Sequence, residues 1–283
     1  MQQRELAWLK NKANEIRIRS VDMVYKAQSG HPGGALSVAD FMAACYFRFM
    51  KLRPEEPTWQ DRDRFVLSKG HACPAQYASL AMKGFFPLEE LDTLRKEGSK
   101  LQGHPSMTKC PGIDISTGSL GQGLACGVGM AIAAKLDRKS FCVYCAVGDG
   151  ECQEGEIWEA ANTAHKYRLD NLFVFVDNNN LQIDGTCDEV MPNIDLGEKF
   201  RAFGFDVWEI DGNSMEQIVT AIELGHASKN GRPKCLFAHT VKGKGVSYME
   251  NQCAWHGMAP NDEQYAQAMR ELEALYIPEV EDG

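Results

Sequence analysis

Two short and almost wholly apolar segments constrain the fold of this 283-residue chain most strongly. They are Phe141–Val147 and Leu172–Val176, and both are rich in β-branched and aromatic residues. Strands that are buried on both faces of a parallel sheet have this composition. Between the two runs lies a helical pattern, Glu154–Tyr167. The arrangement predicts a strand–helix–strand unit whose two strands are parallel.

The same alternation extends over the rest of the chain. Three further runs are predicted strands: Phe205–Ile210, Cys235–Thr240 and, more weakly, Arg64–Leu67. Helical patterns cover Glu5–Gln28, Ser37–Phe49, Gly121–Leu136, Ser214–Ser228 and a stretch from Asn261 to about Leu275, with Ser37 and Ser214 as N-caps. No linker-like stretch divides residues 1–283, so we expect one α/β domain, a doubly wound parallel sheet with helices on both faces. The acidic tail 279–283 is expected to be loose.

Composition narrows the class of protein. A net charge of −9 argues against a nucleic-acid partner, which requires a basic face. The N-terminal segment lacks the apolar core of a secretory signal, and the weakly polar run 123–134 is too short to span a bilayer. Ten cysteines without paired spacing predict a reducing, cytoplasmic compartment. Cys142 and Cys145 form a C-x-x-C, but on a strand this spacing directs them to opposite faces, so we interpret them as core residues and not as a redox or zinc pair.

Oxygen-bearing side chains follow two of the predicted strands. The first strand leads into Gly148-Asp149-Gly150-Glu151 and the second into Asp177-Asn178-Asn179-Asn180. Each cluster alone is typical of a turn. Because ligands of parallel sheets bind beyond the carboxyl ends of the strands, the two clusters together predict a shared binding site. Carboxylate, amide and backbone carbonyl oxygens suit Mg²⁺ or Ca²⁺ and suit zinc poorly, and a diphosphate would complete the shell.

The spacing of the two clusters resembles the thiamine diphosphate motif, in which Gly-Asp-Gly is followed about 30 residues later by Asn-Asn. Five other motifs are similar to those of the transketolase family and occur in the family's order: Ser29-Gly30-His31-Pro32-Gly33-Gly34, Ser68-Lys69-Gly70-His71-Ala72, Gly103-His104-Pro105, Thr117-Gly118-Ser119-Leu120-Gly121-Gln122-Gly123 and Trp255-His256-Gly257. They cover the chain from about residue 20 to 260. The resemblance is to the diphosphate-binding domain of that family.

The resemblance implies a role for individual residues. The metal, Mg²⁺ or else Ca²⁺ or Mn²⁺, would be bound by Asp149, Asn179 and the backbone carbonyl of Leu181. The expected contacts of thiamine diphosphate are His71, Gly118, Ser119, Leu120, Gly148, Gly150, Asn179, Lys242 and His256. His31, His104 and His256 would face the thiazolium ring and the sugar as catalytic residues. Glu154 resembles the family glutamate at the subunit interface.

A structural role is the alternative to a functional one for each of these side chains. Histidine titrates near neutral pH and so suits proton transfer to and from sugar hydroxyls, yet a lone histidine is most often a surface or hydrogen-bonded residue. We assign that ordinary role to three histidines outside any motif, His165, His226 and His239, and treat Lys244 and Glu156 as solvated charges. Three glycines in one helix, Gly123, Gly127 and Gly129, predict close helix packing, within the chain or across an interface.

The function implied by the resemblance is transfer of a two-carbon ketol unit from a ketose phosphate to an aldose phosphate. Full-length transketolases add a pyrimidine-binding domain and a third domain, so we expect a separate subunit that carries these domains, in an α₂β₂ assembly. A piece cut from a longer single-chain transketolase would have the same sequence and is the alternative to such a subunit. The pentose phosphate pathway is the default setting. Two alternatives remain at this point: the matching subunit of another thiamine diphosphate enzyme, of the 2-oxoacid dehydrogenase or deoxyxylulose-phosphate synthase type, and a non-catalytic cofactor-binding protein.

Overall fold

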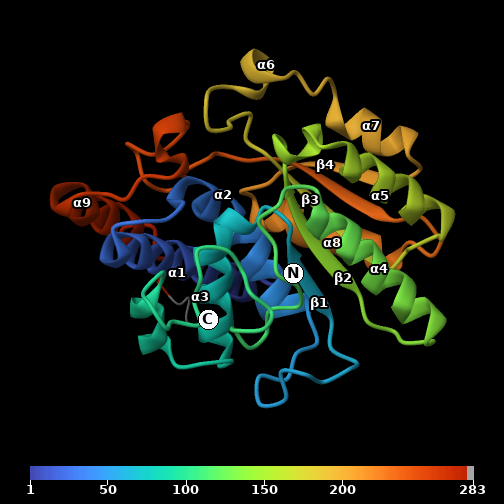
Figure 1. Cartoon of the computed structure of the whole chain (residues 1–283), viewed down its shortest axis with the longest axis horizontal. Helices are drawn as coiled ribbons and strands as arrows, with labels where there is room; N and C mark the ends of the chain where they lie inside the picture. The colour runs from blue at the N-terminus through green and yellow to red at the C-terminus, as the bar shows by residue number, and fades with distance from the viewer. Residues whose placement is uncertain (279–283) are drawn as a thin grey trace.

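A computed structural model describes residues 1–278 as a five-stranded parallel sheet with helices on both faces (Figure 1). The strands are β1 (Arg64–Leu67), β2 (Val143–Gly148), β3 (Leu172–Asn178), β4 (Asp206–Asp211) and β5 (Lys234–His239). The α-helices are α1 (Gln3–Ala27), α2 (Pro32–Ala44), α3 (Cys73–Lys83), α4 (Gln122–Leu136), α5 (Gly155–Lys166), α6 (Cys187–Val190), α7 (Leu196–Ala202), α8 (Met215–Ala227) and α9 (Asp262–Glu273). The shorter helical segments are a π-helical turn η1 (Cys45–Phe49) and the 3₁₀ turns η2 (Gly70–Ala72), η3 (Leu88–Thr93), η4 (Glu151–Gln153) and η5 (Cys253–His256). The predicted fold class is confirmed.

The strand order is β1-β2-β3-β5-β4, and every neighbouring pair is parallel. In register, Gly148 at the end of β2 is paired with Asp177 of β3, and Asp177 with Ala238 of β5. The carboxyl ends of the three central strands therefore lie side by side. The segments that follow β2 and β3 carry the glycine, acid and amide clusters.

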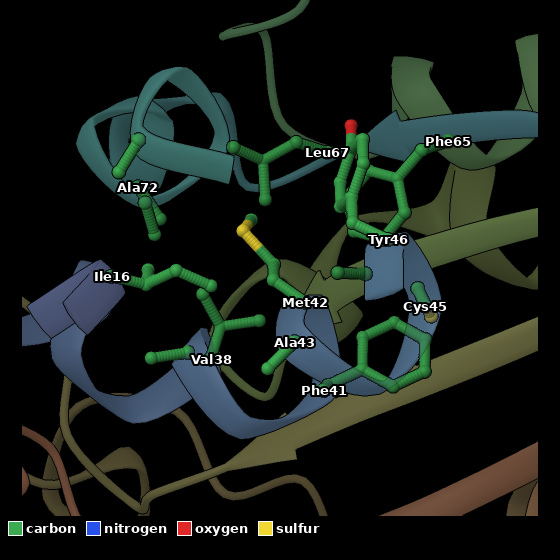
Figure 2. Packing of buried hydrophobic residues seen from close by; sticks show 14 of the residues in the cluster. Ile16, Val38, Phe41, Met42, Ala43, Cys45, Tyr46, Phe65, Leu67 and Ala72 are labelled. Carbon is green, nitrogen blue, oxygen red and sulfur yellow. The ribbon is translucent and has the colours of Figure 1, made fainter. Parts of the chain in front are cut away.

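Two hydrophobic layers hold the helices against the sheet. One face packs against α1, α2, α3 and α8, and the other against α4, α5 and α7. Figure 2 shows the first layer around α2, where Phe41 and Met42 point into the core. The ring of Phe41 stacks on Phe175 of β3 with centroids 4.3 Å apart, and truncating such a buried Phe to Ala typically costs about 3–5 kcal/mol. This packing fixes α2 against the sheet.

Most predicted elements agree with the structure to within a few residues, but the start of α2 was predicted wrongly. Ser37 is not an N-cap, because the helix begins at Pro32, where a proline's missing N–H costs nothing. Ser37 is instead buried inside α2, and its hydroxyl donates to Asp177 over 2.6 Å. The N-cap predicted at Ser214 is confirmed, and Asn261 also caps its helix, since each side chain accepts the backbone N–H three residues on.

Helix α3 was missed by the sequence analysis. Its residues Cys73–Ala81 are all buried. Cys142 and Cys145 pack into opposite layers of the core, as predicted, and all ten cysteines are free. Over residues 1–278, no helix is long and apolar enough to cross a membrane. The prediction of a loose acidic tail concerns residues 279–283, which lie outside the described part of the chain.

Candidate active site

A cavity of about 320 Å³ opens at the carboxyl ends of the strands. It brings together most of the residues that the sequence analysis selected: His31, His71, His104, Gly118, Leu120, Gly148, Asp149, Gly150, Asn179, Leu181, Lys242 and His256. These residues come from loops that are far apart in the sequence. The cavity also includes residues that were not predicted, among them Lys69, Glu151 and Gln182.

Asp149 lies in the turn after β2 and is almost fully buried. One carboxylate oxygen accepts the N–H of Gly150 over 2.8 Å, and the other accepts the N–H of Asn180 over 2.5 Å. Burial, together with the nearby charge of Asp177, raises the pKa of Asp149 to about 6. The side chain is thus a buried carboxylate with free lone pairs, which a cation would stabilise.

The other predicted metal ligands lie in the loop after β3. The amide oxygen of Asn179 accepts the N–H of Leu181 over 3.1 Å. The carbonyl of Leu181 accepts a hydrogen bond from the Lys242 ammonium over 3.0 Å, so a positive charge already contacts this oxygen. Among residues 1–278, no three His, Cys, Asp or Glu side chains form a metal-binding cluster, so a metal here would rely on amide and carbonyl oxygens. A set of one carboxylate, one amide and one carbonyl fits a hard cation such as Mg²⁺.

A buried ion pair that was not predicted organises the same strand ends. Asp177 is fully buried, and it accepts from the Lys69 ammonium over 2.5 Å and from the hydroxyl groups of Ser37 and Thr240. Burial alone raises the pKa of Asp177, but the Lys69 ammonium and the hydrogen bonds hold it below the usual value. The pair ties the loop after β1 and helix α2 to strand β3. The sequence could have indicated a role for Lys69, because this residue lies in the motif that carries His71.

Glu151 fixes the turn of the Gly-Asp-Gly motif. Its buried carboxylate accepts the Ser68 hydroxyl and the backbone N–H groups of Gly121 and Gly148, the last two over 2.9 and 3.0 Å. Burial raises the pKa of Glu151 above its ordinary value, while these hydrogen bonds oppose the rise. The start of α4 and the loop after β1 are therefore both anchored to the motif.

Four histidines surround one end of the cavity. The ring centroid of His31 lies 5.4 Å from that of His71, 6.2 Å from His104 and 5.5 Å from His256. Burial, with nearby cationic side chains, lowers the pKa of His31 to about 4 and that of His256 to about 3. The pKa values of His71 and His104 are lowered too, mainly by burial. All four imidazoles are thus neutral at physiological pH.

Close backbone approaches bring these histidines together. Gly118 adopts a φ of +137°, and a Cβ at this position would lie 2.9 Å from the His104 ring. A Cβ at Gly70 would lie 2.7 Å from the Thr117 hydroxyl. Only glycine allows both approaches.

Some predicted residues lie outside the cavity. Ser119 is exposed and does not line it, and Glu154 is exposed at the N-terminus of α5. Of the motif-free histidines, His226 is hydrogen-bonded to Tyr144, while His239 pairs with Glu209 at the surface. His165 is exposed in the last turn of α5.

The two predicted solvated charges also lie outside it. Lys244 pairs with Glu250 over 3.5 Å, and the carboxylate of Glu156 accepts from Gln122 over 2.5 Å. Neither side chain lines the cavity.

The glycines of α4 differ in their surroundings. A Cβ at Gly123 would lie 2.6 Å from the Cα of Ser68, so this glycine permits close packing within the chain. A Cβ at Gly127 would make ordinary contacts with Val66 and Val143, whereas one at Gly129 would meet nothing within 4 Å. Close packing inside the chain therefore explains Gly123 but not Gly129.

Comparisons with known proteins agree with this geometry. Residues 9–275 match the family model described as transketolase, thiamine diphosphate binding domain. The chain is 46% identical to the 6-deoxy-6-sulfo-D-fructose transketolase subunit SqwG of Clostridium sp. (strain MSTE9), over 94% of this chain and 96% of that protein. It is also 46% identical to a subunit of the apulose-4-phosphate transketolase of Phocaeicola vulgatus, over 93% of each.

Solved structures give the same result. Transketolase from Campylobacter jejuni superposes with a TM-score of 0.88 and 36% identity, covering 94% of this chain and 42% of that one. The chain thus spans about two-fifths of that enzyme. Fold, cavity and comparisons together define a thiamine diphosphate-binding domain. The chain belongs to the transketolase family, and the 2-oxoacid dehydrogenase and deoxyxylulose-phosphate synthase alternatives are not supported.

Proposed function

We propose that this chain is the diphosphate-binding subunit of a two-subunit transketolase. It would transfer a two-carbon ketol unit from a ketose phosphate to an aldose phosphate, with thiamine diphosphate and a divalent metal ion. The observation that carries the proposal is a cavity whose lining combines oxygen ligands with four neutral histidines. When bound, thiamine diphosphate supplies the carbanion chemistry.

Asp149, Asn179 and the Leu181 carbonyl would hold Mg²⁺, or else Ca²⁺ or Mn²⁺, and through it the diphosphate. The carboxylate of Asp149, whose pKa is raised by burial, supports this assignment, as does the hydrogen bond from Lys242 to the Leu181 carbonyl. Gly118, Leu120, Gly148 and Gly150 line the same cavity and would contact the cofactor, together with Ser119 at its edge. The Lys242 ammonium would contact the cofactor from the same cavity.

His31, His104 and His256 would bind and orient the sugar hydroxyls, and His71 would contact the cofactor. Their position around one end of the cavity and their low pKa values support hydrogen bonding in the neutral state. The walls of the cavity would also limit access of water to the reacting atoms.

The partner would be a second chain that carries the pyrimidine-binding domain. The names of the relatives support this proposal, since the chain spans 93–96% of proteins that are themselves called transketolase subunits. The open surface at Gly129 on α4 and the exposed Glu154 are where we expect a neighbouring chain to pack. Two copies of each chain, an α₂β₂ heterotetramer, would give two sites.

The named relatives also bear on the substrate. They act, by name, on a sulfo-sugar and on apulose 4-phosphate, so a pentose phosphate role is only one setting for this chain. The ten free cysteines are consistent with a reducing, cytoplasmic compartment.

A donor screen tests the proposed activity. The chain and its partner subunit, with thiamine diphosphate and Mg²⁺, would be supplied with ketose phosphates or with pyruvate, and an aldose phosphate as acceptor. We expect turnover with a ketose phosphate and none with pyruvate. Turnover of pyruvate alone would contradict the proposal, and saturable cofactor binding without turnover of any donor would favour a non-catalytic protein.

A further inference from the structure

Arg95 lies next to the candidate site, outside the lining of its cavity, in an unusual backbone conformation. It follows η3 and has a φ of +60°, and its N–H donates to the carbonyl of Leu101 over 2.8 Å. Residues other than glycine seldom adopt such a φ, and those that do are often found at functional sites. Arg95 is therefore a candidate functional residue, and its side-chain contacts indicate its role.

The guanidinium of Arg95 joins two of the histidine-bearing loops. Its Nη1 donates to the Ser29 hydroxyl over 3.1 Å, and its Nη2 contacts the carbonyl of Gly103 over 3.4 Å. The same Nη2 lies 3.2 Å from Nδ1 of His31. A Cβ at Gly103 would lie only 3.0 Å from the guanidinium carbon, so this approach depends on the glycine that precedes His104.

The contact with His31 has a fixed polarity. A guanidinium carries only N–H donors and stays protonated, so the nitrogen that it meets must offer a lone pair. Nδ1 of His31 is therefore unprotonated, and in a neutral imidazole the proton then resides on Nε2. The other tautomer, or an imidazolium, would set two N–H groups against each other.

We propose that Arg95 is a positioning residue that holds His31 as the neutral Nε2–H tautomer, so that His31 serves as a hydrogen-bond donor to substrate oxygen atoms and not as a base. The inference rests on the proposed function for the identity of the acceptor, but the tautomer follows from this chain alone. A neutral imidazole can stabilise negative charge that develops on an oxygen without first accepting a proton.

The surroundings of His31 favour the neutral state. The imidazole is half-buried, and its titratable neighbours include His71 and His256, whose ring centroids lie 5.4 and 5.5 Å away. The groups that act most on its charge are Arg95 from the loop after η3, His104, and Lys242 after β5. Burial first, and these groups second, lower the pKa of His31. Nδ1 of His256 is also unprotonated, since it accepts a hydrogen bond from the Lys242 ammonium over 2.9 Å.

Nitrogen-15 NMR of the imidazoles tests the assignment directly. The chain has seven histidines, and the signals of His31 are identified as those that vanish in His31→Gln. The spectrum requires neither cofactor nor partner. We compare the wild type with Arg95→Met, which removes the donors, with Arg95→Lys, which keeps a cation, and with Arg53→Met as a control. Arg53 pairs with Glu56 at the surface and stacks on Trp59.

In the wild type and in Arg53→Met we expect a protonated Nε2 and an unprotonated Nδ1 for His31 over pH 5–8, as burial and the neighbouring cations imply. In Arg95→Met the Nδ1–H tautomer should appear, and the titration midpoint of His31 should rise by about one pH unit because a nearby positive charge is lost. Arg95→Lys should lie between the two. An Nδ1–H tautomer in the wild type, or identical spectra for wild type and Arg95→Met, would overturn the proposal.

A kinetic readout separates positioning from folding. In the reconstituted enzyme, Arg95→Met should lower kcat while the stabilisation by added cofactor stays unchanged, and Arg95→Lys should recover part of the loss. An unaltered kcat with an altered tautomer would refute the donor role. The NMR result does not depend on activity. If the proposed transketolase function is wrong, the wild type will show no turnover, whatever the tautomer of His31.

Discussion

Replacing Asp149 by asparagine should abolish cofactor binding at almost no cost to the fold, and the structure gives the magnitude. The pKa of Asp149 is raised to about 6 by burial and by Asp177. A rise of roughly two units means that ionisation of this carboxyl costs the folded chain about 3 kcal/mol near neutral pH. Because the folded-state pKa is raised, this cost is present above about pH 6 and disappears as the pH falls toward the unfolded value.

Asparagine removes the buried charge but keeps only one of the two acceptors. One of the N–H groups of Gly150 and Asn180 would lose its partner, at a cost of about 1–3 kcal/mol. The two effects oppose each other, so the free energy of unfolding without cofactor should change by less than about 2 kcal/mol. Binding of the metal and its cofactor should be lost, since the amide of asparagine cannot neutralise a divalent cation.

Thermal melting measures both effects. Cofactor with Mg²⁺ at one hundred times its dissociation constant stabilises a protein by about 2.7 kcal/mol, roughly 5 °C in Tm for a chain of this size. We expect this rise for the wild-type chain with its partner and for the control Asp170→Asn, whose carboxylate pairs with Lys135 away from the cavity. Asp149→Asn should show no rise. A full rise in Asp149→Asn, or a collapse of its Tm without cofactor, would refute the reasoning.

Three further predictions concern side chains at the carboxyl ends of the strands. Alanine at His31, His104 or His256 should cut kcat/KM by roughly 10²–10⁴ while leaving the cofactor-induced rise in Tm intact, and losses below about threefold at all three positions would exclude the catalytic assignment. Lys69→Met leaves Asp177 buried without its cation and should lower the free energy of unfolding in denaturant titrations by about 3–5 kcal/mol. Adding Asp177→Asn to this variant should restore part of the lost free energy, and a loss under about 1 kcal/mol in Lys69→Met alone would contradict the prediction. Folded His256 has its pKa lowered to about 3, so it stays neutral while the unfolded chain takes up a proton below about pH 6.5. Denaturant titrations should therefore show the wild type losing stability relative to His256→Gln as the pH falls from about 6.5, and parallel curves would contradict the lowered pKa.

The sequence predicted those parts of the site that depend on local pattern. Asp149 and Asn179 each follow a segment whose composition indicates a buried strand, and parallel strands bring such ends together without further information. The motifs that carry His31, His71 and His256 were recognisable from neighbouring residues.

What the sequence did not predict depends on contacts between distant segments. Asp177 is a buried anchor of the strand ends because Lys69 and Ser37, each over 100 residues away, donate hydrogen bonds to it. The contact of Arg95 with His31 depends on a loop whose backbone conformation has no sequence signature. The start of α2 was misplaced because two glycines after Pro32 suggest a loop, whereas tertiary packing makes them helical.

We propose that this chain supplies half of a transketolase site, and reconstitution tests this proposal most directly. The purified chain, its candidate partner and their mixture would be assayed for ketol transfer with thiamine diphosphate and Mg²⁺, and passed over a sizing column. We predict no turnover from either chain alone, turnover on mixing, and co-elution at the mass of two copies of each. Turnover by the isolated chain at the rate of the mixture would contradict the claim.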